Sequence, residues 1–205
     1  GIQCYVPRNY SHKSSHIAYV LSIEEIQSLF REIDSYQPAV NAETFHRLAL
    51  EYRILFRMLF CCGLRASEAR KLRLDMANLE NGVLRIYQSK GHNDRLVYLP
   101  DDLRQLCCDY LKIMTVKYKI RSEWFFPASD PAKVLQVASI GKRFRLAWGQ
   151  TPYARKGGFQ PTVHSLRHTF VVLRMNEWMK TGVKLDNMMP YLSKYLGHSS
   201  PDDTF

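Results

Sequence analysis

The sequence of 205 residues lacks several features that mark particular classes of protein. It has no run of about 18 apolar residues, which excludes a membrane-spanning helix. Its five cysteines include two adjacent pairs, Cys61-Cys62 and Cys107-Cys108, within apolar helical runs, which favours reduced, buried thiols over a disulfide framework. Neither C-x-x-C nor H-E-x-x-H spacing occurs, so the sequence offers no metal site. The first residues also lack the charged and apolar regions of a signal peptide, and we therefore expect an intracellular protein.

Acidic residues are scarce relative to basic ones. Lys and Arg number 29 against 19 Asp and Glu, which gives a formal net charge of +10 and an isoelectric point near 9.4. Such an excess favours a polyanionic partner, with nucleic acid as the first candidate and an anionic membrane surface as the second. The hydrophobic share of 46% is that of an ordinary globular core, and the length suits one domain with a short arm.

Hydrophobic periodicity predicts a mainly helical chain. An S-x-x-E capping box at Ser22 and Glu25 begins a first helix, and a long apolar helix over 42–62 should be stopped by Gly63. The other segments with helical periodicity are 101–119, 140–148, 162–181 and 186–195. Two short segments rich in β-formers flank a polar loop and predict a hairpin: 83–87 and 95–99. The predicted fold class is mainly α with a small antiparallel β-sheet (α+β).

Five polar residues stand at the ends of predicted elements: Arg65, Lys90, His164, Arg167 and His198. Taken singly, each has an ordinary explanation as a surface or turn residue or, for His164, as the cap of a helix. However, His164 and Arg167 share one helix face, and arginine is almost never buried without an anionic partner. Together the five form a cationic set without a carboxylate pair, which suits the charge that grows on a phosphoryl transition state. A lysine or imidazole could in addition protonate a departing alkoxide.

Four ordered motifs carry a family resemblance: "GLRASE" at 63–68, "SKG" at 89–91, "HSLRH" at 164–168 and "YLGHSS" at 195–200. In order and wording they resemble the tyrosine recombinases, the phage-integrase-like enzymes of DNA strand exchange. The resemblance runs from about Ser22 to the C-terminus. It implies the catalytic-domain fold of that family for residues 21–205 and an N-terminal arm or interdomain linker for residues 1–20.

The resemblance also implies roles for the matching arginines and their neighbours. Arg65 and Arg167 would clamp the scissile phosphate of double-stranded DNA. Glu68 would orient the first of these arginines. His168 would be a structural neighbour of its motif rather than a reacting group.

The remaining three residues of the set would serve proton transfer and DNA contact. Lys90 would be the acid carried by the hairpin loop, while His164 and His198 would transfer protons or contact the phosphate. The reaction so implied is DNA cleavage and rejoining through a 3′-phosphotyrosyl link and a free 5′-hydroxyl, with no cofactor. The biological setting so implied is integration or recombination of a mobile element by a homo-tetramer on paired DNA sites, in the cytoplasm of a prokaryote and away from the membrane.

Two departures from the family's pattern limit these expectations. The nucleophilic tyrosine of the family lies about nine residues beyond the histidine that His198 matches, and the sequence stops at Phe205. Nothing here corresponds to the family's N-terminal DNA-clamping domain. We therefore expect a catalytic domain cut at both ends that does not cleave DNA by itself. A catalytically silent DNA-binding module and a type IB topoisomerase are the two alternatives.

Basic residues outside the motifs are candidates for contact with DNA phosphates. A purely solvated face is the ordinary explanation for such charges, but the excess over the whole chain makes phosphate contact the preferred hypothesis. The predicted set comprises Lys13, Lys142, Arg143, Arg145, Arg155 and Lys156.

Overall fold

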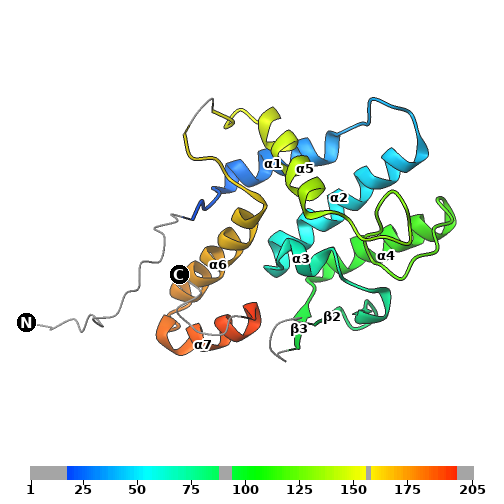
Figure 1. Ribbon diagram of the computed structural model, residues 1–205. Coiled ribbons are helices and arrows are strands. Elements are labelled where there is room, and N and C mark those ends of the chain that lie inside the picture. Colours follow the sequence, from blue (N-terminus) through cyan, green and yellow to red (C-terminus); the bar gives the residue numbers. More distant parts are fainter. Residues whose placement is uncertain (1–17, 88–93, 156–157, 198–205) are drawn as a thin grey trace, which may run out of the picture.

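The computed structural model describes residues 18–87, 94–155 and 158–197 of the chain. Four of the predicted site residues therefore lie outside the described part: Lys13, Lys90, Lys156 and His198. The described elements are α1 (Ile23–Ser35), α2 (Glu43–Cys62), α3 (Ala66–Ala69), the 3-10 turn η1 (Leu74–Met76), β1 (Ala77–Asn78), β2 (Val83–Ile86), β3 (Arg95–Tyr98), α4 (Asp101–Val116), α5 (Val137–Gln150), α6 (Val163–Lys180) and α7 (Leu185–Leu196) (Figure 1). The predicted fold class, mainly helical with a small antiparallel sheet, is confirmed.

The first helix begins as the sequence predicts. The Glu25 backbone N–H donates to Ser22 Oγ at 3.2 Å, and the Ser22 N–H donates to Glu25 Oε2 at 2.8 Å, which completes the capping box. Helix α2 is the central element, because Leu55, Phe56 and their neighbours are fully buried against several other helices. Gly63 ends α2 in the left-handed conformation at φ 63°, which glycine adopts without steric cost.

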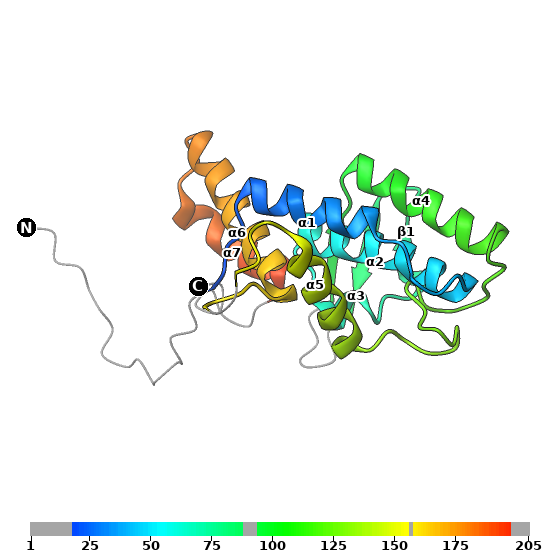
Figure 2. The ribbon, with the colours of Figure 1, turned by 90° about the horizontal axis from the view of Figure 1, so that it is seen from above.

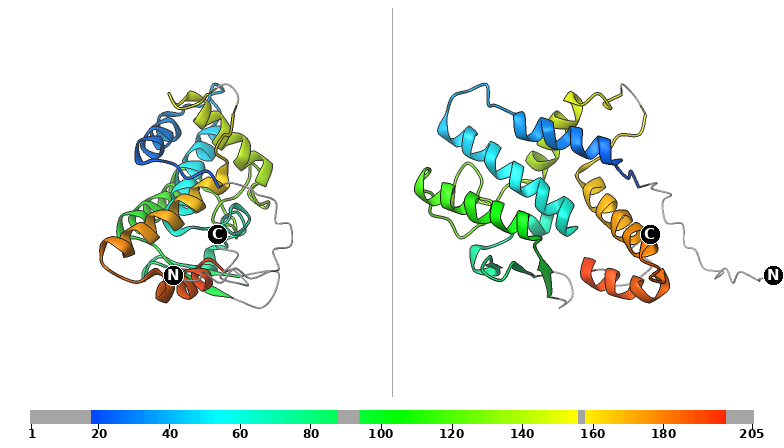
Figure 3. Two further views of the ribbon diagram at one scale, coloured as in Figure 1. Left: turned by 90° about the vertical axis from the view of Figure 1, so that its left-hand side faces the viewer. Right: turned by 180° about the vertical axis from the view of Figure 1, so that it is seen from behind.

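The other helices pack around α2 and against one another. α2 contacts α4 on one side and α6 on another, while α1 packs on α5. Seen from above, α6 and α7 lie at one end of the molecule and α4 at the other (Figure 2). The view from behind shows α6 and α7 as a pair that turns back on itself (Figure 3). A separate small apolar cluster joins this pair: Phe170, Val171, Met189, Leu192 and Leu196.

The sheet has three antiparallel strands in the order β1-β2-β3. The two predicted strands are confirmed, with Ile86 opposite Arg95 and Val83 opposite Tyr98. Strand β1 was not predicted, because two residues are too few to show an alternating pattern. Buried and exposed side chains alternate along β2 and β3, so that one face of the hairpin covers the core.

Arg47 and Glu51 form an ion pair that is buried inside this frame. The two residues lie one turn apart on α2, with side chains 3% and 0% exposed. Arg47 Nη2 also donates to the Ala128 carbonyl at 2.8 Å, which ties α2 to the segment after the buried Phe125 and Phe126. The pair therefore fastens a loop to the central helix.

Among the helices of residues 18–87, 94–155 and 158–197, none combines the length and the apolar character that spanning a membrane requires.

Candidate active site

Arg65 is placed by the abrupt turn at the end of α2. Gly63 redirects the chain, and Arg65 becomes the N-cap residue of the short helix α3. Glu68, three residues on, accepts from the Arg65 backbone N–H at 2.8 Å through Oε2 and from Arg65 Nη1 at 3.0 Å through Oε1. The carboxylate thus holds both the backbone and the side chain of Arg65, which is the contact that an orienting role requires.

Arg95, at the start of β3, is a member of the site that sequence reasoning did not predict. Its Nη1 donates to Glu68 Oε1 at 3.0 Å and its Nη2 to Glu68 Oε2 at 2.8 Å, a bidentate pair with Arg95 only 7% exposed. A signal was present in the sequence. Arg95 is in phase with the apolar residues Val97 and Leu99, and a charged residue on the inward face of a strand needs a buried partner.

Arg167 reaches the same place from α6. Its Nη1 donates to the Gly63 carbonyl at 2.7 Å and its Nη2 to the Leu196 carbonyl at 2.8 Å, and Nη1 lies 3.9 Å from Glu68 Oε2. The side chain is 3% exposed, so the alternative of a solvated surface arginine is wrong. Burial first, and then the positive charge of Arg65, lower the pKa of Arg167 to about 9.

The two arginines of the predicted clamp therefore meet. Arg65 Nη1 lies 3.4 Å from the Leu196 carbonyl oxygen, the same atom that Arg167 Nη2 contacts. Gly63 allows this convergence, because a Cβ on residue 63 would lie 2.5 Å from the ring of Phe170 on α6. Sharing one carbonyl oxygen shows that the two guanidinium groups are close enough to share one small anion.

His164 lies in the first turn of α6, beside these charges. Its ring meets the ring of His168 edge-on, with 4.5 Å between centroids. Partial burial, followed by the nearby positive groups of His168, Arg167 and Arg65, lowers the pKa of His164 to about 4, although the residue keeps an exposed edge. The interpretation of His164 as the helix cap is not supported, since the reciprocal cap joins Thr162 and Ser165.

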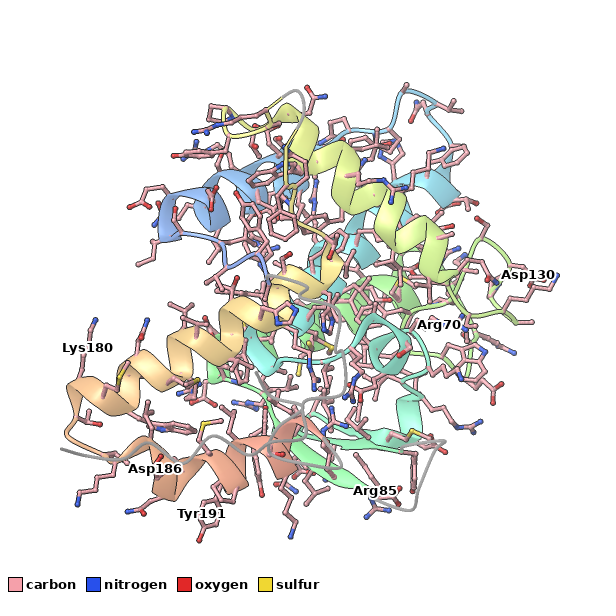
Figure 4. The ribbon with its side chains drawn as sticks, turned by 60° about the vertical axis from the view of Figure 1, so that its left-hand side comes forward. Arg70, Arg85, Asp130, Lys180, Asp186 and Tyr191 are labelled. Carbon is pink, nitrogen blue, oxygen red and sulfur yellow. The ribbon has the colours of Figure 1, made fainter. Side chains whose placement is uncertain are left out.

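A cleft of about 780 Å³ opens beside Arg65. Glu68 and Gly197 line it where it meets the arginine cluster of Arg65, Arg95 and Arg167. The rest of the wall is rich in positive and aromatic side chains: Arg65, Lys71, Arg73, Arg85, Tyr87 and Trp124. Arg85 projects outward from β2, as Figure 4 shows. A cleft with this lining can receive a phosphate-bearing chain next to the buried arginines.

The predicted DNA-contacting residues of α5 divide into two groups. Lys142 and Arg145 are exposed, as is Arg155 beyond the end of the helix. Arg143 requires a correction: it is 9% exposed, and its guanidinium carbon lies 3.0 Å from the ring centroid of Tyr36. It falls on the inward stripe of α5 with Ile140 and so does not face a DNA backbone.

The family model described as "Phage integrase family" matches residues 20–204. The chain belongs to this family. Similar proteins include integrase/recombinase y4rE of Sinorhizobium fredii, 26% identical over 185 residues that cover 90% of this chain and 57% of that protein. Tyrosine recombinase XerA of Pyrococcus furiosus is 27% identical over 158 residues, which cover 74% of this chain and 48% of that protein. The chain thus spans about half the length of the curated relatives it matches.

Solved structures of the phage integrase family share the fold. XerH site-specific recombinase bound to palindromic difH substrate, a post-cleavage complex, superposes with a TM-score of 0.70 at 21% identity, covering 94% of this chain and 50% of that chain. A lambda integrase tetramer bound to a Holliday junction gives a TM-score of 0.61 at 16% identity, covering 92% and 49%. The chain accordingly has the catalytic-domain fold of the tyrosine recombinases.

Proposed function

We propose that this chain is the phosphate-activating domain of a site-specific DNA recombinase that integrates or excises a mobile element. The observation that carries the proposal is the meeting of Arg65 and Arg167, which are 102 residues apart in the sequence, at one carbonyl oxygen. Two guanidinium groups at one point would bind the non-bridging oxygens of a DNA phosphate and stabilise the additional charge of the transition state. The basic cleft beside Arg65 would hold the flanking DNA.

The reaction follows from this arrangement and from the family. A tyrosine beyond Phe205 would attack phosphorus, the bond to the 5′-oxygen would break, and the phosphate would stay linked to the DNA 3′ end through the tyrosine. The departing 5′-oxygen needs a proton, which Lys90 or a histidine would donate. The charges of Arg167 and Arg65 act on His164, which supports a role in phosphate contact, and its lowered pKa leaves it neutral at pH 7. While no anion is bound, His164 would therefore act as a neutral hydrogen-bonding group.

Assembly on DNA is the second part of the proposal. The XerH and lambda integrase structures hold DNA, and the latter is a tetramer on a four-way junction. Together with the net charge of +10, this supports double-stranded DNA as the partner and a homo-tetramer as the active assembly.

The test is capture of the covalent intermediate. The protein extended through the tyrosine is incubated with a pool of nicked duplexes, and adducts that survive detergent are isolated and their DNA sequenced. We expect adducts at one preferred site, with the protein on the DNA 3′ end. Relaxation of supercoils without a preferred site would favour the topoisomerase alternative. DNA binding without any adduct would favour the silent module.

A further inference from the structure

Glu68 is the carboxylate at the centre of the arginine cluster, and its hydrogen-bonding capacity is filled. Oε1 accepts from Arg65 Nη1 and from Arg95 Nη1, both at 3.0 Å. Oε2 accepts from the Arg65 backbone N–H and from Arg95 Nη2, both at 2.8 Å. An ionised carboxylate offers about four lone-pair sites. Arg95 occupies two of them, so half of the acceptor capacity of Glu68 is taken by a residue outside the predicted clamp.

This division leaves Arg65 partly available. Within the described ranges, Arg65 gives only its backbone N–H and Nη1 to protein acceptors, and its Nε and Nη2 make no hydrogen bond there. Those two nitrogens form one edge of the guanidinium fork, the geometry that binds phosphate in a bidentate manner.

Removing Arg95 would free two acceptor sites on a carboxylate that is 9% exposed. A buried carboxylate with unfilled sites is costly, so it would draw in the nearest donors. The donors at hand are the remaining nitrogens of Arg65 and Arg167 Nη1, which is already 3.9 Å away. Each donor captured by Glu68 would no longer be available to the phosphate.

Arg95 is also firmly held. It is the first residue of β3 and pairs across the sheet with Ile86, the last residue of β2. Its side chain points to the covered face of the hairpin and is 7% exposed. The strand that carries Arg95 therefore helps to fix the position of Glu68.

We propose that Arg95 is a positioning residue of the active site, which saturates Glu68 and so keeps the guanidinium of Arg65 free for the phosphate. This rests on the proposed function, since it assumes that the cluster binds an oxyanion. Arg95 does not touch the reacting atoms; its effect passes through Glu68 and Arg65.

The experiment titrates orthovanadate, a phosphate mimic, into the 205-residue protein at fixed ionic strength and measures binding by calorimetry. Three variants are compared: Arg95→Gln, the double variant Glu68→Gln with Arg95→Gln, and Arg31→Gln as a control. Arg31 is exposed on α1, so its variant removes the same charge away from the cluster. Near-ultraviolet circular dichroism verifies that each variant keeps its packing.

We expect Arg95→Gln to weaken vanadate binding about tenfold, the usual scale for removal of a group that orients a ligand. The double variant should recover to within about threefold of the wild type, because a neutral amide at residue 68 no longer captures Arg65. A merely structural role for Arg95 would make the double variant at least as weak as the single one. Arg31→Gln should bind as the wild type does.

Two results would overturn the inference: a folded Arg95→Gln protein that binds vanadate as Arg31→Gln does, or a double variant with no recovery. If Arg95→Gln fails to fold, Arg95→Lys replaces it; a lysine keeps the charge but has no fork, and should show a smaller loss that Glu68→Gln again relieves. Failure of the wild type to bind vanadate would instead count against the phosphate site itself. The two kinds of failure are thus distinguishable.

Discussion

Two clusters in this molecule pair arginine with a buried glutamate but differ in charge balance. In the first, one arginine meets one carboxylate, Arg47 with Glu51. In the second, three arginines surround the single carboxylate Glu68. Burial raises the pKa of Glu51 to about 8 in spite of Arg47. Burial also acts to raise the pKa of Glu68, but the hydrogen bonds and charge of Arg95, together with Arg167, lower it overall.

The difference shows what distinguishes a structural ion pair from a site that binds an anion. Burial is common to both clusters, so burial alone marks neither as functional. The one-to-one pair holds one carboxyl group for one guanidinium group, and a further donor of Arg47 goes to the Ala128 carbonyl. The three-to-one cluster has an excess of guanidinium groups over carboxylates among the described residues. That excess suits an incoming anion.

The largest expected effect comes from breaking the balanced pair. Arg47→Ala leaves Glu51 buried without its cation, and we expect a loss of about 3–5 kcal/mol in the free energy of unfolding. Urea denaturation measures it. Replacing both residues, as Arg47→Met with Glu51→Leu, should restore most of the stability. A loss below about 1 kcal/mol for the single variant would show that the pair does not fasten the loop.

Arg167→Ala in the unbalanced cluster should act on chemistry. In the protein extended through the tyrosine, we expect the rate of DNA cleavage to fall ~10²-fold or more, because a transition-state donor is removed. Single-turnover cleavage of nicked DNA gives the rate. Arg167→Lys is the matched variant: it keeps the charge, yet one ammonium group cannot reproduce the paired hydrogen bonds to Gly63 and Leu196. An unchanged cleavage rate in Arg167→Ala would refute the assignment.

The pH dependence of stability is a smaller effect. It tests the surroundings of the cluster around Glu68, where His164 lies. The pKa of His164 is lowered from 6.5 to about 4 in the folded protein, so the unfolded chain binds more protons between those values. The contribution of His164 to stability should therefore be complete above pH 6.5 and fall on acidification toward pH 4, with the lowered pKa of Glu68 adding to the loss at the acidic end. The raised pKa of Glu51 acts in the opposite direction, so the comparison with a His164 variant isolates this contribution. Urea midpoints at about pH 7, 6 and 5 test this. The slope should flatten in His164→Gln, which removes the titrating ring.

The smallest effects belong to the exposed charges of α5. Replacing Lys142 and Arg145 by glutamine should weaken DNA binding only a few-fold and reduce its salt slope by about 1 for each DNA phosphate that is no longer neutralised. Filter binding from low to high salt measures the slope. Arg143→Gln is the internal control, since its buried guanidinium over Tyr36 should affect stability and leave the salt slope unchanged. A lower slope in Arg143→Gln would instead place that side chain at the DNA.

Local signals were enough to predict most of the fold. The capping box at Ser22 and the left-handed stop at Gly63 act within a few residues, so the start of α1 and the end of α2 followed from them. Strand β1 was missed because its two residues are too few to show an alternating pattern. Arg143 was assigned to the surface on charge alone, although its spacing from Ile140 places it on the inward face of α5.

The site was predicted in part. Motif order led to Arg65, Glu68, His164 and Arg167, which the structure brings together, while their roles remain predictions. Arg95 escaped because its importance depends on the partner that folding supplies, and no short-range pattern names that partner. Lys90 and His198 lie outside the described residues, so their places in the site also remain predictions.

The bare α-carbon of Gly63 has a consequence for the clamp as a whole. Where any other residue would carry a methyl or more, the ring of Phe170 already fills the space. The distance between the guanidinium groups of Arg65 and Arg167 therefore depends on the absence of a side chain at residue 63. A side chain at residue 63 would force the two guanidinium groups apart. One of them would then no longer reach the bound phosphate.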